Sequence, residues 1–73
     1  KAAKEKQLAD KLCRDLCCSK TMEYELRQYI RYCFIENIDI NGVVCKMYEE
    51  NMMPCNDKRE GKKRFEQLKS RLL

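Results

Sequence analysis

The stretch that decides the fold is MEYELRQYIRYCF, which covers residues 22–34. Its apolar residues recur every three or four positions, the spacing of one face of an α-helix: Met22, Leu26, Tyr29, Ile30, Cys33 and Phe34. Tyr24, Tyr32 and Ile35 fall partly off this stripe, so the helix is apolar round more than half its girth. A central helix that contacts two neighbours has this pattern.

A helix is predicted on the N-terminal side of this stretch, over residues 2–18. Leu8, Leu12 and Leu16 repeat at intervals of four residues, and its other faces are charged. Ser19-Lys20-Thr21 interrupts the pattern, and Thr21 is the predicted N-cap of the central helix. The sequence therefore predicts two helices joined by a short turn.

Two further helices are predicted on the C-terminal side. Residues 41–53 carry a third apolar stripe that begins at Val43-Val44, with Asp39 or Asn41 as the N-cap and Pro54 as the stop. A short strand at the β-branched pair Val43-Val44 is the alternative. The fourth segment begins at Asn56-Asp57, where Asp57 and Glu60 form a capping-box pattern, and it carries the apolar series Phe65, Leu68 and Leu72. Gly61 lies inside this helix and costs it about 1 kcal/mol relative to alanine.

The charge is distributed unevenly along the 73 residues. Residues 1–55 carry nine basic and nine acidic side chains, so the net charge of +4 comes entirely from residues 56–73. All six cysteines lie before this basic segment. The sequence predicts a disulfide-bonded helical core over residues 1–55 and a basic amphipathic helix or tail over residues 56–73.

The six cysteines in so short a chain predict three disulfides and an oxidising compartment. If consecutive helices lie antiparallel, the cysteines fall at heights along the helices that allow the pairs Cys13–Cys33, Cys17–Cys45 and Cys18–Cys55. Exchanging Cys17 with Cys18, or pairing Cys33 with Cys45, fits almost as well. A zinc site is disfavoured because no C-x2-C pair occurs. The expected fold is an all-α, three- to four-helix, disulfide-stabilised miniprotein.

The absence of histidine removes several kinds of chemistry. Serine and cysteine nucleophiles that need an imidazole base are excluded, as are mixed Cys/His zinc sites. We therefore expect no enzyme, no metal and no cofactor. No apolar run reaches the roughly 18 residues of a membrane-spanning helix.

The basic C-terminal segment is the candidate binding site. A cationic helix of this kind engages an acidic receptor or channel vestibule, or lies on an anionic membrane surface. Nucleic acid is not expected as a partner, because residues 1–55 are neutral and no nucleic-acid motif occurs. The candidate target-binding residues are Lys58, Arg59, Lys62, Lys63, Arg64, Lys69 and Arg71.

A basic, helical chain of this size with six cysteines resembles the secreted peptide toxins of arthropod venoms. The resemblance covers residues 13–55 by cysteine count and helicity, and the cysteine spacing matches no single family. It implies a secreted, extracellular peptide effector that modulates a membrane ion channel or receptor. The alternatives are a membrane-active amphipathic cationic peptide and a mitochondrial intermembrane-space helical-hairpin protein. The C-x9-C spacing of Cys45 and Cys55 supports the last of these, although such proteins carry two such motifs.

Overall fold

The computed structural model describes residues 2–73 and contains four helices, which confirms the all-α prediction. They are α1 (Ala2–Asp15), α2 (Lys20–Ile35), α3 (Ile40–Glu49) and α4 (Lys58–Leu72). No strand forms within the described range, so Val43-Val44 is helical and the strand alternative is wrong. The radius of gyration of 11.1 Å equals the roughly 11 Å expected for a compact chain of this length.

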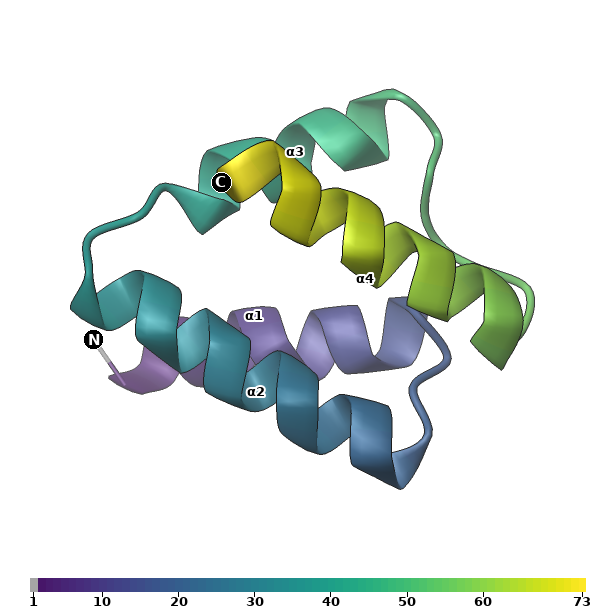
Figure 1. The fold of residues 1–73 in the computed structure, drawn as a ribbon, viewed down its shortest axis with the longest axis horizontal. Coiled ribbons are helices and arrows are strands. Elements are labelled where there is room, and N and C mark those ends of the chain that lie inside the picture. The colour runs from purple at the N-terminus through teal and green to yellow at the C-terminus, as the bar shows by residue number, and fades with distance from the viewer. Residues whose placement is uncertain (1) are drawn as a thin grey trace.

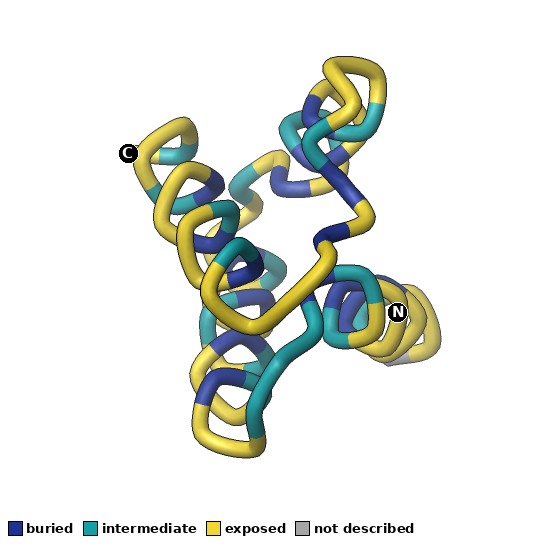
Figure 2. The backbone as a smooth tube through the Cα atoms, turned by 90° about the vertical axis from the view of Figure 1, so that its right-hand side faces the viewer, coloured by how far each residue is buried: buried dark blue, intermediate teal, exposed yellow. Residues whose placement is uncertain are grey.

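The helices form two antiparallel pairs that pack on each other (Figure 1). Helices α1 and α2 make one pair, α3 and α4 make the other, and α2 also contacts α3. The end-on view shows the buried side of each helix turned toward a shared centre (Figure 2). Each helix therefore has one face in the core and one face in solvent.

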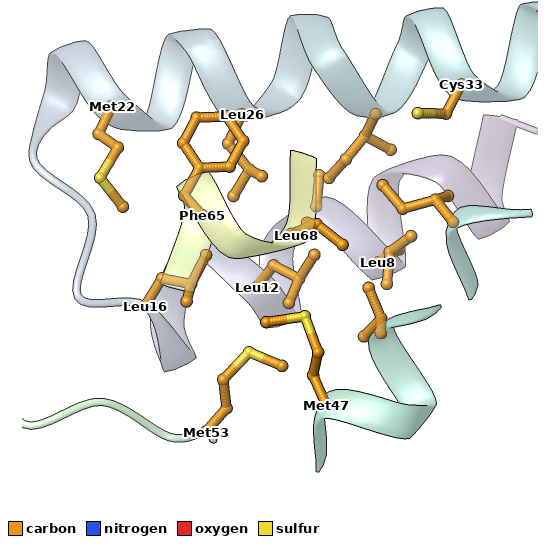
Figure 3. Close-up of a cluster of buried hydrophobic side chains, with 14 of the residues drawn as sticks. Leu8, Leu12, Leu16, Met22, Leu26, Cys33, Met47, Met53, Phe65 and Leu68 are labelled. Carbon is orange, nitrogen blue, oxygen red and sulfur yellow. The ribbon is translucent and has the colours of Figure 1, made fainter. Parts of the chain in front are cut away.

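A single apolar core lies between the two pairs (Figure 3). It contains no buried polar or charged residue within the described chain. Helix α1 supplies Leu8 and Leu12 of the predicted repeat, Leu16 follows directly after its last residue, and α2 supplies four residues of its predicted stripe. The most deeply buried side chains are Leu12, Leu16, Leu26, Ile30, Cys33, Ile40, Met47 and Leu68.

Helix α4 belongs to this core and is not a separate tail. Phe65 and Leu68 are only 2% and 1% exposed, and the Phe65 ring points toward Met22 and Leu26 of α2 (Figure 3). The Phe65 ring also packs edge-on against Tyr29, with ring centroids 6.1 Å apart. The division into a core of residues 1–55 and a tail of residues 56–73 therefore does not describe the packing.

Gly61 explains why α4 can approach so closely. A Cβ atom at this position would lie 1.7 Å from the backbone oxygen of Leu16, at the end of α1. Only glycine leaves room for the two backbones to touch. The residue that the sequence analysis treated as a defect of this helix is therefore a requirement of its packing.

Three helices end in the same backbone motif. In each, one residue adopts a left-handed conformation: Cys17 with φ 53°, Asn37 with φ 58° and Asn51 with φ 61°. The next N–H bonds five residues back, from Cys18 to Cys13 O at 3.1 Å and from Met52 to Met47 O at 3.0 Å. This is the Schellman ending. It stops α1 at Asp15 and α3 at Glu49, before the predicted ends at Cys18 and Met53, and Pro54 is not the stop.

The N-caps agree with the sequence in two helices of three. Asp39 accepts a hydrogen bond from Gly42 N at 2.9 Å, and Asp57 accepts one from Glu60 N at 2.8 Å, as predicted. The predicted cap Thr21 is wrong, because Ser19 accepts from Met22 N at 3.2 Å instead. Serine is the better N-cap of the two, and the cap at Ser19 starts α2 two residues earlier than a cap at Thr21 would.

All six cysteines, each within the described part of the chain, are free thiols. The expected pairs Cys13–Cys33, Cys17–Cys45 and Cys18–Cys55 are not formed. Cys33 and Cys55 are buried apolar residues of the core, whereas Cys45 is exposed on α3. Phe65 and Leu68 of α4 belong to the apolar core together with Cys33 and Cys55, and a buried free cysteine packs there as a small hydrophobic residue.

Candidate binding surface on helix α4

The structure divides the seven predicted binding residues into two groups. Arg64, Lys69 and Arg71 are used within the fold. The Arg64 Nε donates to the backbone oxygen of Met52 at 3.0 Å, and its guanidinium lies 3.6 Å from the Glu60 carboxylate. Arg64 therefore ties α4 to the segment that follows α3.

Lys69 and Arg71 also have intramolecular partners. The Lys69 Nζ lies 3.2 Å from a Glu66 oxygen and 4.5 Å from the centroid of the Phe65 ring. Arg71 donates to both oxygens of Glu50, the C-cap residue of α3, at 2.6 and 3.3 Å. These hydrogen bonds hold the pKa of Glu50 below its usual range. Arg71 therefore helps to fix α4 on the bundle, whereas the partners of Lys69 lie within α4 itself.

The second group is Lys58, Arg59, Lys62 and Lys63, which we call the α4 cationic surface. All four side chains are exposed. None of them forms an ion pair with the part of the chain that the structure describes. At this helical spacing the four lie on adjoining rows of one side of α4. They present a compact group of positive charges to solvent.

The position of this surface is unfavourable for the helix itself. Lys58 and Arg59 occupy the first turn of α4, where the helix dipole favours negative charge. The like-charged pairs Lys58–Lys62 and Arg59–Lys63 stand four residues apart, which costs a few tenths of a kcal/mol each. Asp57 and Glu60 offset part of this cost. Local stability therefore does not account for the four cations.

Two shallow hollows flank the α4 cationic surface. One, of about 350 Å³, lies between α4 and the start of α2, and Met22 and Phe65 contribute to its lining. The rest of that lining is polar and of mixed charge: Ser19, Thr21, Glu25, Lys58, Arg59, Lys62 and Glu66. The other, of about 500 Å³, lies along α4 itself, from Arg59 to Gln67. Aliphatic stems of lysine and arginine form apolar walls while the charged ends stay in water. Glu66 lines both hollows, so the positive charge next to them is partly balanced there.

Three reactive side chains have pKa values raised by burial: Cys18, Tyr48 and Cys55. Burial raises the pKa of the Cys55 thiol, and burial together with the nearby Cys13 raises the pKa of Cys18 to about 12. Burial, followed by a hydrogen bond to Asp15, raises the pKa of the Tyr48 hydroxyl. A nucleophilic thiol requires a lowered pKa, so these shifts run opposite to what catalysis needs. No cluster of three or more metal-binding side chains occurs in residues 2–73.

No protein-family model matches the chain, and no curated protein or solved structure is significantly similar to it. None of the four described helices is both long and apolar enough to cross a membrane. The function must therefore be argued from this chain's own surface.

Sequence reasoning located the basic segment but missed its division. Basic side chains occur throughout residues 58–73. Whether each of them has an intramolecular partner depends on carboxylates and carbonyls that only folding brings near. Glu50, for example, lies 21 residues before Arg71. The participation of Ser19 and Thr21 in the α4 hollow was likewise not predicted, because it depends on how α2 and α4 pack.

Proposed function

We propose that the protein acts by binding, and that the α4 cationic surface recognises an acidic surface on a partner protein. The observation that carries the proposal is the group of four exposed cations that form no ion pair within residues 2–73, two of which, Lys58 and Arg59, lie in the first turn of α4, where the helix dipole disfavours positive charge. Positive charges on a rigid element steer association with acidic partners and set orientation. The helix fixes the spacing of the four charges before any partner arrives.

The partner class that we favour is the acidic outer surface of a membrane channel or receptor, with the protein acting as a secreted effector. The composition of the basic segment and the resemblance to venom peptides support this choice of class. The fold supports a protein partner over lipid insertion. Phe65 and Leu68 would form the membrane-facing side of a lipid-bound α4, and both are buried in the core. Insertion would require α4 to leave the bundle.

The direct test compares two triple variants with the same net charge. The first replaces Arg59, Lys62 and Lys63 with glutamine, which removes most of the α4 cationic surface. The matched control replaces three exposed lysines elsewhere with glutamine: Lys4, Lys6 and Lys46. Each triple change lowers the net charge from +4 to +1.

The probes are a fluorescent polyglutamate peptide and vesicles containing phosphatidylserine. We expect the wild type to bind the peptide with an affinity that falls as salt rises. The α4 variant should lose at least about tenfold in affinity, as expected when several cation–carboxylate contacts are removed, while the control stays within about twofold. Equal losses in both variants would show that only net charge matters and would contradict the proposal. Leakage of the vesicles by the wild type would favour the membrane-active alternative instead.

A further inference from the structure

Two cysteines meet at the end of α1. Cys13 lies in the last turn of this helix, and Cys18 lies in the connection that leads to α2. The Cys18 N–H donates to the Cys13 carbonyl oxygen at 3.1 Å, across the left-handed residue Cys17. In a Schellman ending this bond brings the side chains of the two bonded residues into contact. The backbone therefore places the thiols of Cys13 and Cys18 beside each other.

The other two endings of this kind carry different pairs at the same two positions. The bond from Ile38 N to Cys33 O joins a cysteine with an isoleucine, and the bond from Met52 N to Met47 O joins two methionines. An apolar contact at these positions commonly accompanies the motif. Of the three endings, the one at α1 is alone in having a thiol at both positions. The same contact that is merely apolar in α2 and α3 is chemically reactive in α1.

The two thiols interact with each other and are partly open to solvent. Burial raises the pKa of both thiols, and a hydrogen bond between them then lowers the pKa of Cys13 and raises that of Cys18. Both side chains are partly exposed, whereas Cys33 and Cys55 are buried. A dissolved oxidant can therefore reach Cys13 and Cys18.

Cys17 is the neighbouring thiol that competes for this pairing. Its Sγ donates to the backbone oxygen of Cys55 at 3.2 Å. Cys55 in turn donates its N–H to the backbone oxygen of Asp15 at 2.7 Å, which fixes it beside the end of α1. The Cys17 side chain is thus directed to the connection between α3 and α4, and Cys18 is the thiol left for Cys13.

We propose that Cys13 and Cys18 form a thiol–disulfide site, which a small-molecule disulfide such as oxidised glutathione converts into a bridge across the end of α1. Cys13 gives its proton to water, and its thiolate attacks one sulfur of the oxidant, so that a mixed disulfide forms and one glutathione thiolate leaves. Cys18 then gives its proton to water and attacks the Cys13 sulfur, and the second glutathione thiolate leaves. Two protein thiols are oxidised, and one glutathione disulfide is reduced to two thiols.

The surroundings of the two thiols set the order of the steps and the lifetime of the bridge. Burial raises both pKa values, to about 12 at Cys18, but the nearby Arg27 guanidinium opposes this rise at Cys13, so Cys13 attacks first. Little thiolate is present at neutral pH, and the bridge forms slowly. A thiolate of raised pKa is also a poor leaving group, so the bridge resists reduction once it has formed. These are properties of a structural disulfide and not of a catalytic one.

The bridge closes a corner on which three helices depend. Leu16 lies between the two cysteines, and its carbonyl oxygen packs against Gly61 of α4. Ser19 directly follows Cys18 and caps α2. The start of α4 lies at the same end of the bundle (Figure 1). Closing the loop from Cys13 to Cys18 reduces the freedom of the unfolded chain, so oxidation stabilises the fold without changing the packing.

The first experiment maps the bridge in a reduced Cys45→Ser parent, which lacks the exposed thiol of α3. The protein is treated with oxidised glutathione, its remaining thiols are blocked with N-ethylmaleimide, and it is digested with trypsin, which cleaves at Arg14 between the two cysteines. Mass spectrometry should find residues 12–14 joined to residues 15–20 by a disulfide, with Cys17 blocked. A bridge from Cys17 to Cys55, or a glutathione adduct of Cys13 that is never resolved, would overturn the proposal.

Two variants of this parent separate the adjacent cysteines. Cys17→Asn keeps a residue that tolerates the left-handed conformation, as Asn37 and Asn51 do in the other two endings, and it should form the linked product as the parent does. Cys18→Ala should form almost none of it. Equal yields from the two variants, or a loss in Cys17→Asn alone, would overturn the assignment to Cys18.

The second experiment compares urea unfolding of the oxidised and reduced parent. The equilibrium constant for unfolding should fall on the order of tenfold in the oxidised form, as expected when a short loop is closed, whereas oxidised glutathione should leave that of Cys18→Ala unchanged. An oxidised form no more stable than the reduced one would show that the bridge strains the helix ending, and would overturn the placement argued from the backbone. Neither experiment bears on the proposed function, because no acidic partner is present.

Discussion

The contact between Gly61 and α1 makes the sharpest prediction for stability. In Gly61→Ala, the new Cβ would stand 1.7 Å from the carbonyl oxygen of Leu16 and 2.7 Å from its carbonyl carbon. Real contacts of this kind stay above 3.0 Å, so the backbones of α1 and α4 must separate by at least 1.3 Å, the difference between 3.0 and 1.7 Å. The obstacle is backbone, which cannot swing aside as a side chain does.

The magnitude follows from two opposing effects. Alanine in place of glycine favours the helix by about 1 kcal/mol. Overpacking costs about 1–3 kcal/mol when side chains absorb the strain, and more here because two helices must part and loosen the packing of Phe65 and Leu68. We expect a net loss of about 2 kcal/mol. That is a large share of the roughly 4–11 kcal/mol that a domain of 73 residues has in total.

The assay is urea unfolding followed by circular dichroism at 222 nm. The control is Lys63→Gly, on the exposed side of the same helix, which should cost about 1 kcal/mol through helix propensity alone. If Gly61→Ala proves as stable as the wild type or more stable, helix propensity is the dominant effect and the argued contact with Leu16 is refuted.

Three further predictions concern the packing, the ion pairs and the thiols. Deletion of residues 58–73 should abolish the cooperative thermal transition, because it removes Phe65 and Leu68 from the core; a truncated chain that still melts cooperatively would restore the separate-tail interpretation. Replacing Arg71 with alanine should raise the pKa of Glu50, measured by carboxyl NMR titration, toward its usual 4.5. The pKa of Glu50 is lower in the folded than in the unfolded protein, so its ionised form stabilises the fold above pH 4.5. This stabilisation is lost as the pH falls below 4.5 and through the folded-state pKa. The Arg71→Ala variant should therefore lose less stability than the wild type over this pH range. In the native protein a thiol reagent should react fastest with the exposed Cys45, and all six thiols should react after unfolding without reductant. If no thiol reacts after unfolding, the protein contains three disulfides.

The sequence predicted the helices well because their signals are local. The four-residue spacing of Leu8, Leu12 and Leu16 depends on no other part of the chain, and neither does the capping bond of Asp57. Helix ends were less accurate. Cys17 takes a left-handed conformation that glycine or asparagine usually occupies. A cysteine at this position therefore does not predict the end of α1.

The errors concern long-range packing. Six cysteines suggested cross-links because the composition gave no measure of how much core α4 would add, and Gly61 looked unfavourable because its neighbour, Leu16, is 45 positions away. Within the candidate site, the sequence identified all four cations of the α4 cationic surface but could not separate them from Arg64, Lys69 and Arg71, whose partners are brought near only by folding.

The shared helix ending has a consequence for motion. The amides of Cys18, Ile38 and Met52 lie in connections between helices, yet each is bonded to a carbonyl five residues back, at 3.1, 2.8 and 3.0 Å. Amide hydrogen exchange at these positions requires opening of the preceding helix end. The three corners should therefore exchange as slowly as the last turns of the helices they follow, and the bundle should respond to slow opening events as one unit rather than as rods joined by loose hinges.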